Sequence, residues 1–222
     1  MEQIRDPALI AIGVGHLIGK TCGDNIPVIR GSRPETSEDD LKGLGAVSAS
    51  SGLVALFHAV GPTPEAETLE MAPGGRKPTM VIRLTADDLR EQIRAISMVP
   101  EGTKLGGVNL GTPHFSINQF ACLMPLLEQG AFKVPFYINT SRAAYEEIRE
   151  RGWLSLMEAK GITVVTDTCT YTSTIIRDFS GAMMTNSGKW AYYAPGNLGA
   201  KVAFGSVADC VRSAVLGEVS RA

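Results

Sequence analysis

The chain has 222 residues, of which 44% are hydrophobic, so it is long enough to bury one large core or two smaller ones. Its 21 basic and 23 acidic residues are mixed along the chain and give a net charge of −2, which argues against nucleic acid as a partner. No apolar run approaches the ~20 residues of a membrane span, and the N-terminus lacks the profile of a signal peptide. We therefore expect a cytoplasmic protein that does not enter membranes.

The four cysteines lie far apart and form no Cys-x-x-Cys pair. In a chain of this length they do not predict a disulfide framework, in agreement with a cytoplasmic protein. Cys122 and Cys210 lie within apolar helical patterns, so we interpret both as packing residues. Cys169 follows a predicted strand among polar residues, so both burial and metal ligation remain open for it.

The nonapeptide GVGHLIGKT, residues 13–21, looks at first like a loop that binds phosphate. A P-loop requires its first glycine where this chain has Val14. Gly15 and Gly19 are also one residue too far apart for a dinucleotide fingerprint. A helix should begin at the Gly-Lys-Thr end, whereas turn-forming residues follow there. We interpret the segment as a loop that approaches another backbone or a ligand closely, and not as a phosphate site.

The remaining pattern predicts an α/β fold. Residues 1–52 are rich in glycine and proline and predict a loop-rich stretch that ends in a helix and completes a larger fold. Residues 53–222 alternate short apolar runs with amphipathic segments, which predicts a mostly parallel sheet with helices on both faces. In chain order we expect a helix over 37–51, strands over 54–60 and 79–84, a helix over 86–97, a strand over 107–110, a helix over 117–129, a strand over 134–139, helices over 142–151 and 153–160, strands over 162–167, 182–185 and 201–204, and a helix over 207–216.

Polar loops follow several of the predicted strands. Ligands of open parallel sheets bind beyond the carboxyl ends of the strands, so these loops are candidates for a binding pocket. The candidate side chains that they carry are Thr63, Thr112, His114, Cys169, Asn186, Ser187 and Lys189.

Each candidate also has a purely structural interpretation. Thr63, Thr112 and Ser116 can cap helices, and His114 can stabilise a turn. Lys189 can be a solvated surface lysine, or its ammonium can join the free amides of a helix start in binding a carboxylate or phosphate.

Several stretches together resemble the large subunit of the aconitase X family. They are GLGAVSASSGLVALFHAVGPTPEA, LGTPHFS, VVTDTCTY, MTNSGKWAYYAPG and VAFGSVADCV, in this order along the chain. The resemblance covers the chain from about Gly15 onward and only the C-terminal half of the family's large subunit. It implies an aconitase-like domain, an upstream half and a small swivelling-type partner subunit.

The resemblance implies a hydro-lyase that dehydrates a small hydroxy acid with an iron-sulfur cluster or iron centre. The substrate expected first is cis-3-hydroxy-L-proline, and phosphomevalonate is the alternative. Cys169 matches a cluster cysteine of the family, and Asn186, Ser187 and Lys189, with Thr63 and His114, are the expected substrate-binding residues. The catalytic base is not assigned.

One position departs from the family pattern. Many members have Gly-Cys-Pro-His where this chain has Gly111-Thr112-Pro113-His114, and a threonine hydroxyl is a poor iron ligand beside a thiolate. A different class of function therefore stays open, namely a non-catalytic scaffold half that binds a partner subunit.

Overall fold

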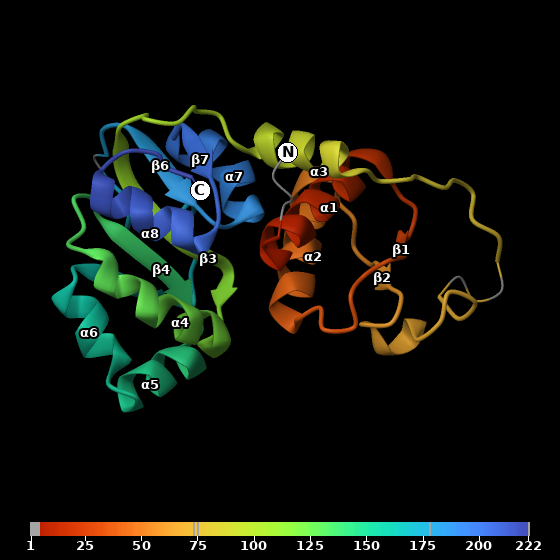
Figure 1. Ribbon diagram of the computed structural model, residues 1–222, viewed down its shortest axis with the longest axis horizontal. Coiled ribbons are helices and arrows are strands. Elements are labelled where there is room, and N and C mark those ends of the chain that lie inside the picture. Colours follow the sequence, from red (N-terminus) through yellow and green to blue (C-terminus); the bar gives the residue numbers. More distant parts are fainter. Residues whose placement is uncertain (1–4, 73, 75, 178, 222) are drawn as a thin grey trace. The chain divides into compact units, whose positions relative to one another are not determined.

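The computed structural model describes residues 5–72, 74, 76–177 and 179–221. The chain divides into two compact units, Met1–Ile93 and Arg94–Ala222 (Figure 1). The sequence pattern predicts a division after residue 52, whereas the two units divide after Ile93. Residues 53–93, which that prediction grouped with the second segment, thus lie in the first unit. No helix in the described part of the chain is both long and apolar enough to span a membrane.

The first unit is built on two helices that approach each other through glycine. Helix α1 covers Pro7–Thr21 and helix α2 covers Glu38–Gly52. A Cβ atom on Gly15 would lie 2.5 Å from the backbone oxygen of Leu44, and one on Gly19 would lie 2.9 Å from that of Ser48. A side chain at either glycine would therefore force the two helices apart.

The nonapeptide GVGHLIGKT forms the C-terminal part of α1, so the expectation of a loop there is wrong. Asp6 caps the start of the helix, since its carboxylate accepts from the backbone amide of Ala8 at 2.9 Å, and Pro7 is the first helical residue. Contact with α2 outweighs the low helix propensity of the glycines. The close approach of backbones was correctly inferred, and Lys20 lies in the last turn of α1, not at the start of a helix.

Two strands predicted for the first unit are short or absent. Within the predicted strand 54–60, only β2 at His58–Ala59 forms, paired in parallel with β1 at Val28–Ile29 and followed by the 3-10 helix η1 at Pro64–Ala66. Residues 79–84 form no strand and stay exposed up to helix α3 at Ala86–Ile96. Their apolar, β-branched composition favours a strand, but no neighbouring strand pairs with them.

The second unit contains a five-stranded parallel sheet. Its strands are β3 (Leu105–Phe115), β4 (Phe136–Thr140), β5 (Ile162–Thr166), β6 (Ala182–Thr185) and β7 (Val202–Phe204), in the order β5-β4-β3-β6-β7. Each pair is parallel, as predicted. The chain thus starts in the middle of the sheet, builds outward to β5, and returns to build outward to β7.

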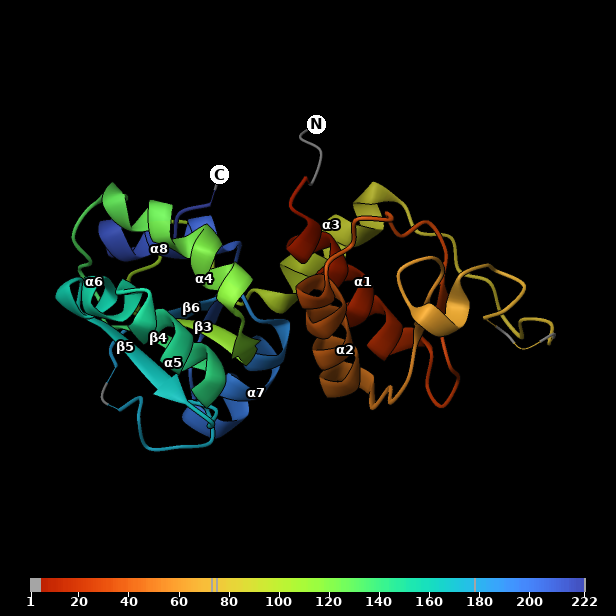
Figure 2. The ribbon, with the colours of Figure 1, turned by 90° about the horizontal axis from the view of Figure 1, so that it is seen from below.

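Helices cover both faces of this sheet. The covering elements are α4 (Ile117–Leu123), the 3-10 helix η2 (Met124–Gln129), α5 (Arg142–Glu150), α6 (Trp153–Ala159), α7 (Gly188–Leu198) and α8 (Val207–Leu216). Figure 2 shows α4 and α8 on one side of the sheet and α7 on the other. Right-handed crossovers produce this arrangement, because the connections from β3 to β4 and from β6 to β7 run in opposite directions along the sheet.

The core of the second unit lies between the sheet and the helices that include α4 and α8. Phe120 on α4 and Val211 on α8 are fully buried there beside Val108 and Ile138 of the sheet. Caps fix where these helices begin: Ser116 and Ser206 each accept from the third amide of their helix in a capping box. These capping boxes agree with the start predicted for each helix.

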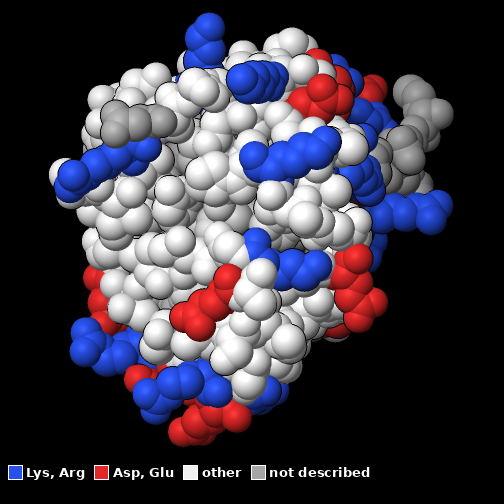
Figure 3. All heavy atoms as spheres, turned by 90° about the vertical axis from the view of Figure 1, so that its left-hand side faces the viewer, with Lys and Arg blue, Asp and Glu red and all other residues white. Residues whose placement is uncertain are grey.

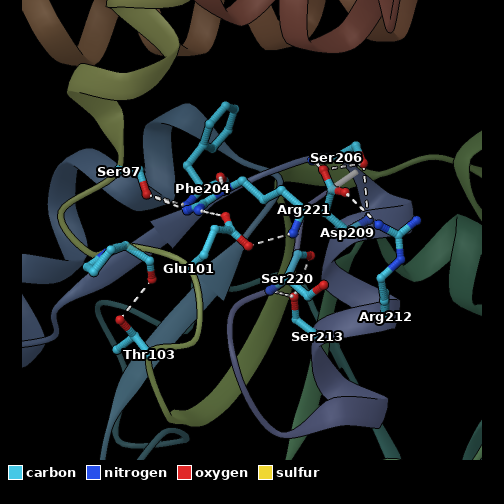
Figure 4. A network of polar contacts seen from close by, with 11 residues as sticks. Ser97, Glu101, Thr103, Phe204, Ser206, Asp209, Arg212, Ser213, Ser220 and Arg221 are labelled. Carbon is cyan, nitrogen blue, oxygen red and sulfur yellow. Dashed lines mark hydrogen bonds and ion pairs between the residues drawn. The ribbon is translucent and has the colours of Figure 1, made fainter.

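Near the C-terminus, Arg221 binds residues of β7 and of the segment before β3. The Arg221 guanidinium donates to the Phe204 carbonyl at 2.8 Å and to the Ser97 hydroxyl at 2.6 Å, and it pairs with Glu101 (Figure 4). These contacts join the C-terminus to the segment that precedes β3. On the face drawn in Figure 3, charged side chains of both signs are scattered over a largely uncharged surface.

The glycine contact between α1 and α2 predicts opposite effects for two glycine substitutions. Gly15→Ala should destabilise the first unit by about 1–3 kcal/mol, because the added methyl group overpacks the interface. Gly43→Ala in α2 is the control, since its Cβ would lie 3.7 Å from Ile12, and it should stabilise by about 0.5–1 kcal/mol. Hydrogen exchange of the α1 and α2 amides measures both changes. Equal effects of the two substitutions would contradict the account.

Candidate functional site

The strand order of the second unit identifies one edge of the sheet as the place for a ligand. The chain leaves β3 toward β4 on one side and reaches β6 and β7 on the other, so the topology reverses between β3 and β6. In open parallel sheets, ligands bind beyond the carboxyl ends of the strands at this switch point. The C-terminal part of β3 and the segment after β6 carry most of the candidate residues.

The turn within the C-terminal part of β3 has an unusual backbone. Gly111 and Thr112 both adopt positive φ, at 80° and 74°, and the Thr112–Pro113 peptide bond is cis. A β-branched residue rarely adopts a positive φ, and such conformations concentrate at functional sites. Thr112 is 1% exposed, and its hydroxyl has no hydrogen-bond partner among the described residues. Thr112 caps no helix here.

The segment between β6 and α7 is bonded to that turn. The Asn186 side-chain oxygen accepts from the Gly111 amide at 3.2 Å. The Ser187 hydroxyl donates to the Thr112 carbonyl and accepts from the Trp190 amide at 3.0 Å, so Ser187 is also the N-cap of α7. The structure therefore brings Thr112, Asn186 and Ser187 together, as the sequence analysis expected of loops at one sheet edge.

Lys189 is the second residue of α7, two positions after the cap Ser187. Helix α7 begins where a helix start was inferred, although its extent to Leu198 was not predicted. The backbone amides at a helix start carry partial positive charge, and the Lys189 ammonium adds a full charge beside them. The side chain is half-buried. This end of α7 is suited to a carboxylate or phosphate.

The loop after β5 supplies a thiol and an acid. The Asp167 carboxylate binds the backbone amide of Arg142 at 3.0 Å and its guanidinium at 2.8 Å, and these hydrogen bonds lower the pKa of Asp167. The charge of His114, which is exposed, makes the smallest contribution to lowering that pKa. Cys169 is half-buried. Burial, and next the neighbouring Cys169, raise the pKa of Tyr171, whose ring stacks on Tyr193 at 5.3 Å.

A buried polar network that the sequence analysis missed lies beneath these loops. The Thr170 hydroxyl donates to the Asn109 side-chain oxygen at 2.7 Å and accepts from the Trp190 indole N–H at 2.9 Å. The Asn139 amide donates to Asn109 at 2.9 Å and to the Leu110 carbonyl at 3.1 Å. The signal was an asparagine inside each of two apolar strands, where both faces are covered.

The other candidates have contacts of their own. Thr63 belongs to the first unit, and its hydroxyl binds the amide and carbonyl of Ala59 at 3.1 and 3.0 Å. Cys210 is fully buried, as expected of a packing residue, and burial raises the pKa of its thiol. Cys122 is exposed, so the expectation that it packs is wrong, because α4 turns Phe120 and Leu123 inward instead.

The donor set does not form a complete metal site. Within the described ranges, no three His, Cys, Asp or Glu side chains gather so that they could hold a metal ion. Iron-sulfur clusters are generally held by several cysteine thiolates, and Cys169 is the cysteine that this sheet edge offers. The described residues therefore do not fit such a cluster by themselves.

The double role of Ser187 predicts an unusually large effect of its removal. Ser187→Ala should destabilise the second unit by about 2–4 kcal/mol, since it removes a cap and also leaves the Thr112 carbonyl without its donor. Ser141→Ala removes the cap of α5 alone and should cost about 1 kcal/mol. Denaturant unfolding followed by tryptophan fluorescence measures both, since Trp153 and Trp190 lie in this unit. Equal losses would show that the Ser187–Thr112 bond contributes nothing.

Two family models match the chain. The model described as "Aconitase X second domain" matches residues 4–94, and the one described as "Aconitase X third domain" matches residues 105–216. Their division falls where the two compact units divide. A solved structure titled aconitase X (holo-form), from Thermococcus kodakaraensis, has the same fold with a TM-score of 0.78 and 24% identity, covering 96% of this chain and 53% of that one.

Curated relatives are similar over most of the chain. A cis-3-hydroxy-L-proline dehydratase of Pseudomonas aeruginosa is 37% identical over 92% of this chain and 36% of its own length. A phosphomevalonate dehydratase large subunit of Methanosarcina mazei is 32% identical over 94% of this chain and 49% of its own length. The chain thus spans about a third to a half of the relatives that it matches. With both domain models matched in order, it belongs to the aconitase X family.

Proposed function

We propose that this chain is the C-terminal part of an aconitase-X-type hydro-lyase, in which the carboxyl edge of the second-unit sheet binds a small hydroxy acid. The observation that carries the proposal is the junction at the switch point, where the segment after β6 is bonded to the turn of β3 and Lys189 follows. The curated names of the relatives support a dehydratase. Cis-3-hydroxy-L-proline is the first candidate substrate, and phosphomevalonate is the second.

The roles of the anchoring residues follow from their contacts. The Lys189 ammonium and the first amides of α7 would bind the substrate carboxylate. The oxygen of Asn186 is engaged by Gly111, so its amide nitrogen is the group left to donate to the substrate. Ser187 supports the site by fixing where α7 begins. His114 and Thr63 are the other proposed substrate-binding residues, and the proton acceptor is not assigned.

The iron-sulfur cluster or iron centre proposed for the enzyme would draw only part of its ligands from this chain. Cys169 is the proposed ligand, because its loop lies at the same sheet edge. Thr112, at a position that is cysteine in many family members, offers a hydroxyl, which is a poor ligand for iron. The remaining ligands would come from outside the described residues. We infer further that the upstream half and a small partner subunit complete the enzyme in the cytoplasm.

A scaffold half without catalytic function is the competing proposal. The incomplete donor set favours it, since the described residues do not hold a metal by themselves. Dehydration of cis-3-hydroxy-L-proline by the assembled enzyme, purified without oxygen, separates the two. A scaffold half predicts that assembly occurs and that substitutions at the proposed site leave turnover unchanged.

Lys189→Ala in the assembled enzyme should lower kcat/KM on the order of 10- to 150-fold, since it removes a charge-assisted hydrogen bond to the substrate. Because the carboxylate is present in both ground and transition states, much of the loss should appear as a higher KM. Steady-state dehydration kinetics measure the loss. The control is Lys201→Ala at the start of β7, on the opposite edge of the sheet. Equal kinetics of the two variants would place the anion site elsewhere.

Cys169→Ser should remove the visible charge-transfer absorption of the iron-loaded assembly, whereas Cys122→Ser and Cys210→Ser should retain it. The physical reason is that a thiolate binds iron far better than a hydroxyl does. Anaerobic absorption spectra and iron content of the three variants provide the measurement. Loss of absorption in all three would indicate general misfolding, and retention in all three would exclude Cys169 as a ligand.

A further inference from the structure

The buried network of Asn109, Asn139, Thr170 and Trp190 connects the two sides of the candidate site. We propose that Thr170 is a positioning residue, whose hydroxyl sets the position of Cys169 relative to Lys189. The catalytic meaning of this role rests on the proposed function, whereas the structural role can be tested independently of it.

Each of the two proposed functional residues lies next in sequence to one partner of a single hydrogen bond. Cys169 precedes Thr170 in the loop after β5, and Lys189 precedes Trp190 in α7. The Thr170 hydroxyl accepts from the Trp190 indole N–H at 2.9 Å. This hydrogen bond therefore joins the backbone that bears the thiol to the backbone that bears the ammonium, and the stacking of Tyr171 on Tyr193 adds a second contact between the same loop and α7.

The same hydroxyl is anchored to the middle of the sheet. It donates to the Asn109 side chain on β3 at 2.7 Å, and the Asn139 amide on β4 lies within 3.5 Å of it. Asn139 also binds the carbonyl of Leu110, the residue before the positive-φ turn. Hydrogen bonds of this network thus connect the loop after β5 and the start of α7 to the turn in β3 that Ser187 binds.

Burial makes this contact hard to replace. The four side chains are fully buried, so water does not take over a lost hydrogen bond. Removing the Thr170 hydroxyl leaves the Trp190 donor without an acceptor, and buried unpaired groups are costly. Of the two residues that follow, Tyr171 adds a stacking contact with Tyr193, which no hydrogen bond replaces. The Thr172 hydroxyl reaches only the Cys169 carbonyl, at 2.9 Å, and is exposed.

The test measures the alkylation of individual cysteines by iodoacetamide at one fixed pH, followed by peptide mass spectrometry of this chain. Three cysteines of the second unit report different events. Cys169 is half-buried and reports its loop, Cys122 is exposed and gives the reference rate, and Cys210 is fully buried and reports unfolding of the unit.

Thr170→Val keeps the shape of the side chain and removes its hydroxyl, so the loop should open more often. The alkylation rate of Cys169 relative to Cys122 should rise on the order of tenfold, while Cys210 stays protected. Thr170→Ser restores the hydroxyl and should return the rate to within about twofold of wild type. Thr172→Val is the matched control, which loses an exposed hydroxyl of the same loop and should leave the rate nearly unchanged.

The proposal is overturned if Thr170→Val leaves Cys169 as protected as in the wild type, or if Thr172→Val exposes it equally. Parallel exposure of Cys210 would assign Thr170 a role in general stability and would also overturn the proposal. None of these readings depends on turnover or on iron. A failure of the proposed function would instead appear as unchanged kinetics of Lys189→Ala in the assembled enzyme, so the two failures are distinguishable.

Discussion

The arrangement of the candidate site depends on the hydrogen bond between the Thr170 hydroxyl and the Trp190 indole, deep beneath the carboxyl edge of the sheet. A parallel sheet brings its loops to one edge but does not fix how they lie relative to one another. In this chain, buried polar side chains on β3 and β4 provide that order, and Ser187 and Asn186 extend it to the turn in β3.

Much of the second unit is readable from the sequence, because the local signals and the tertiary structure agree there. Ser116 and Ser206 mark helix starts through capping boxes, and the apolar run over 182–185 is a strand buried on both faces. The convergence of Thr112, Asn186 and Ser187 follows from the general rule for parallel sheets. The roles of these residues in binding remain proposals.

Other features depend on contacts that the sequence does not display. The glycines of α1 lower its helix propensity, and only the proximity of α2 explains them. Residues 79–84 have the composition of a strand but no partner, so composition alone misleads. The network around Thr170 joins residues up to 81 positions apart, from Asn109 to Trp190, and an asparagine in a strand does not reveal its partner.

Hydrogen exchange of the two tryptophan indole N–H groups tests the central claim, that this network is closed and rigid. The chain has only Trp153 and Trp190, so each indole gives one resolved signal in a nitrogen-correlated NMR spectrum. Trp153 is partly exposed on the surface helix α6, and its N–H should exchange rapidly. The Trp190 N–H should exchange only when the second unit unfolds, orders of magnitude more slowly. Comparable exchange of the two indoles would contradict the account, because it would show that the Thr170–Trp190 bond opens freely in the folded protein.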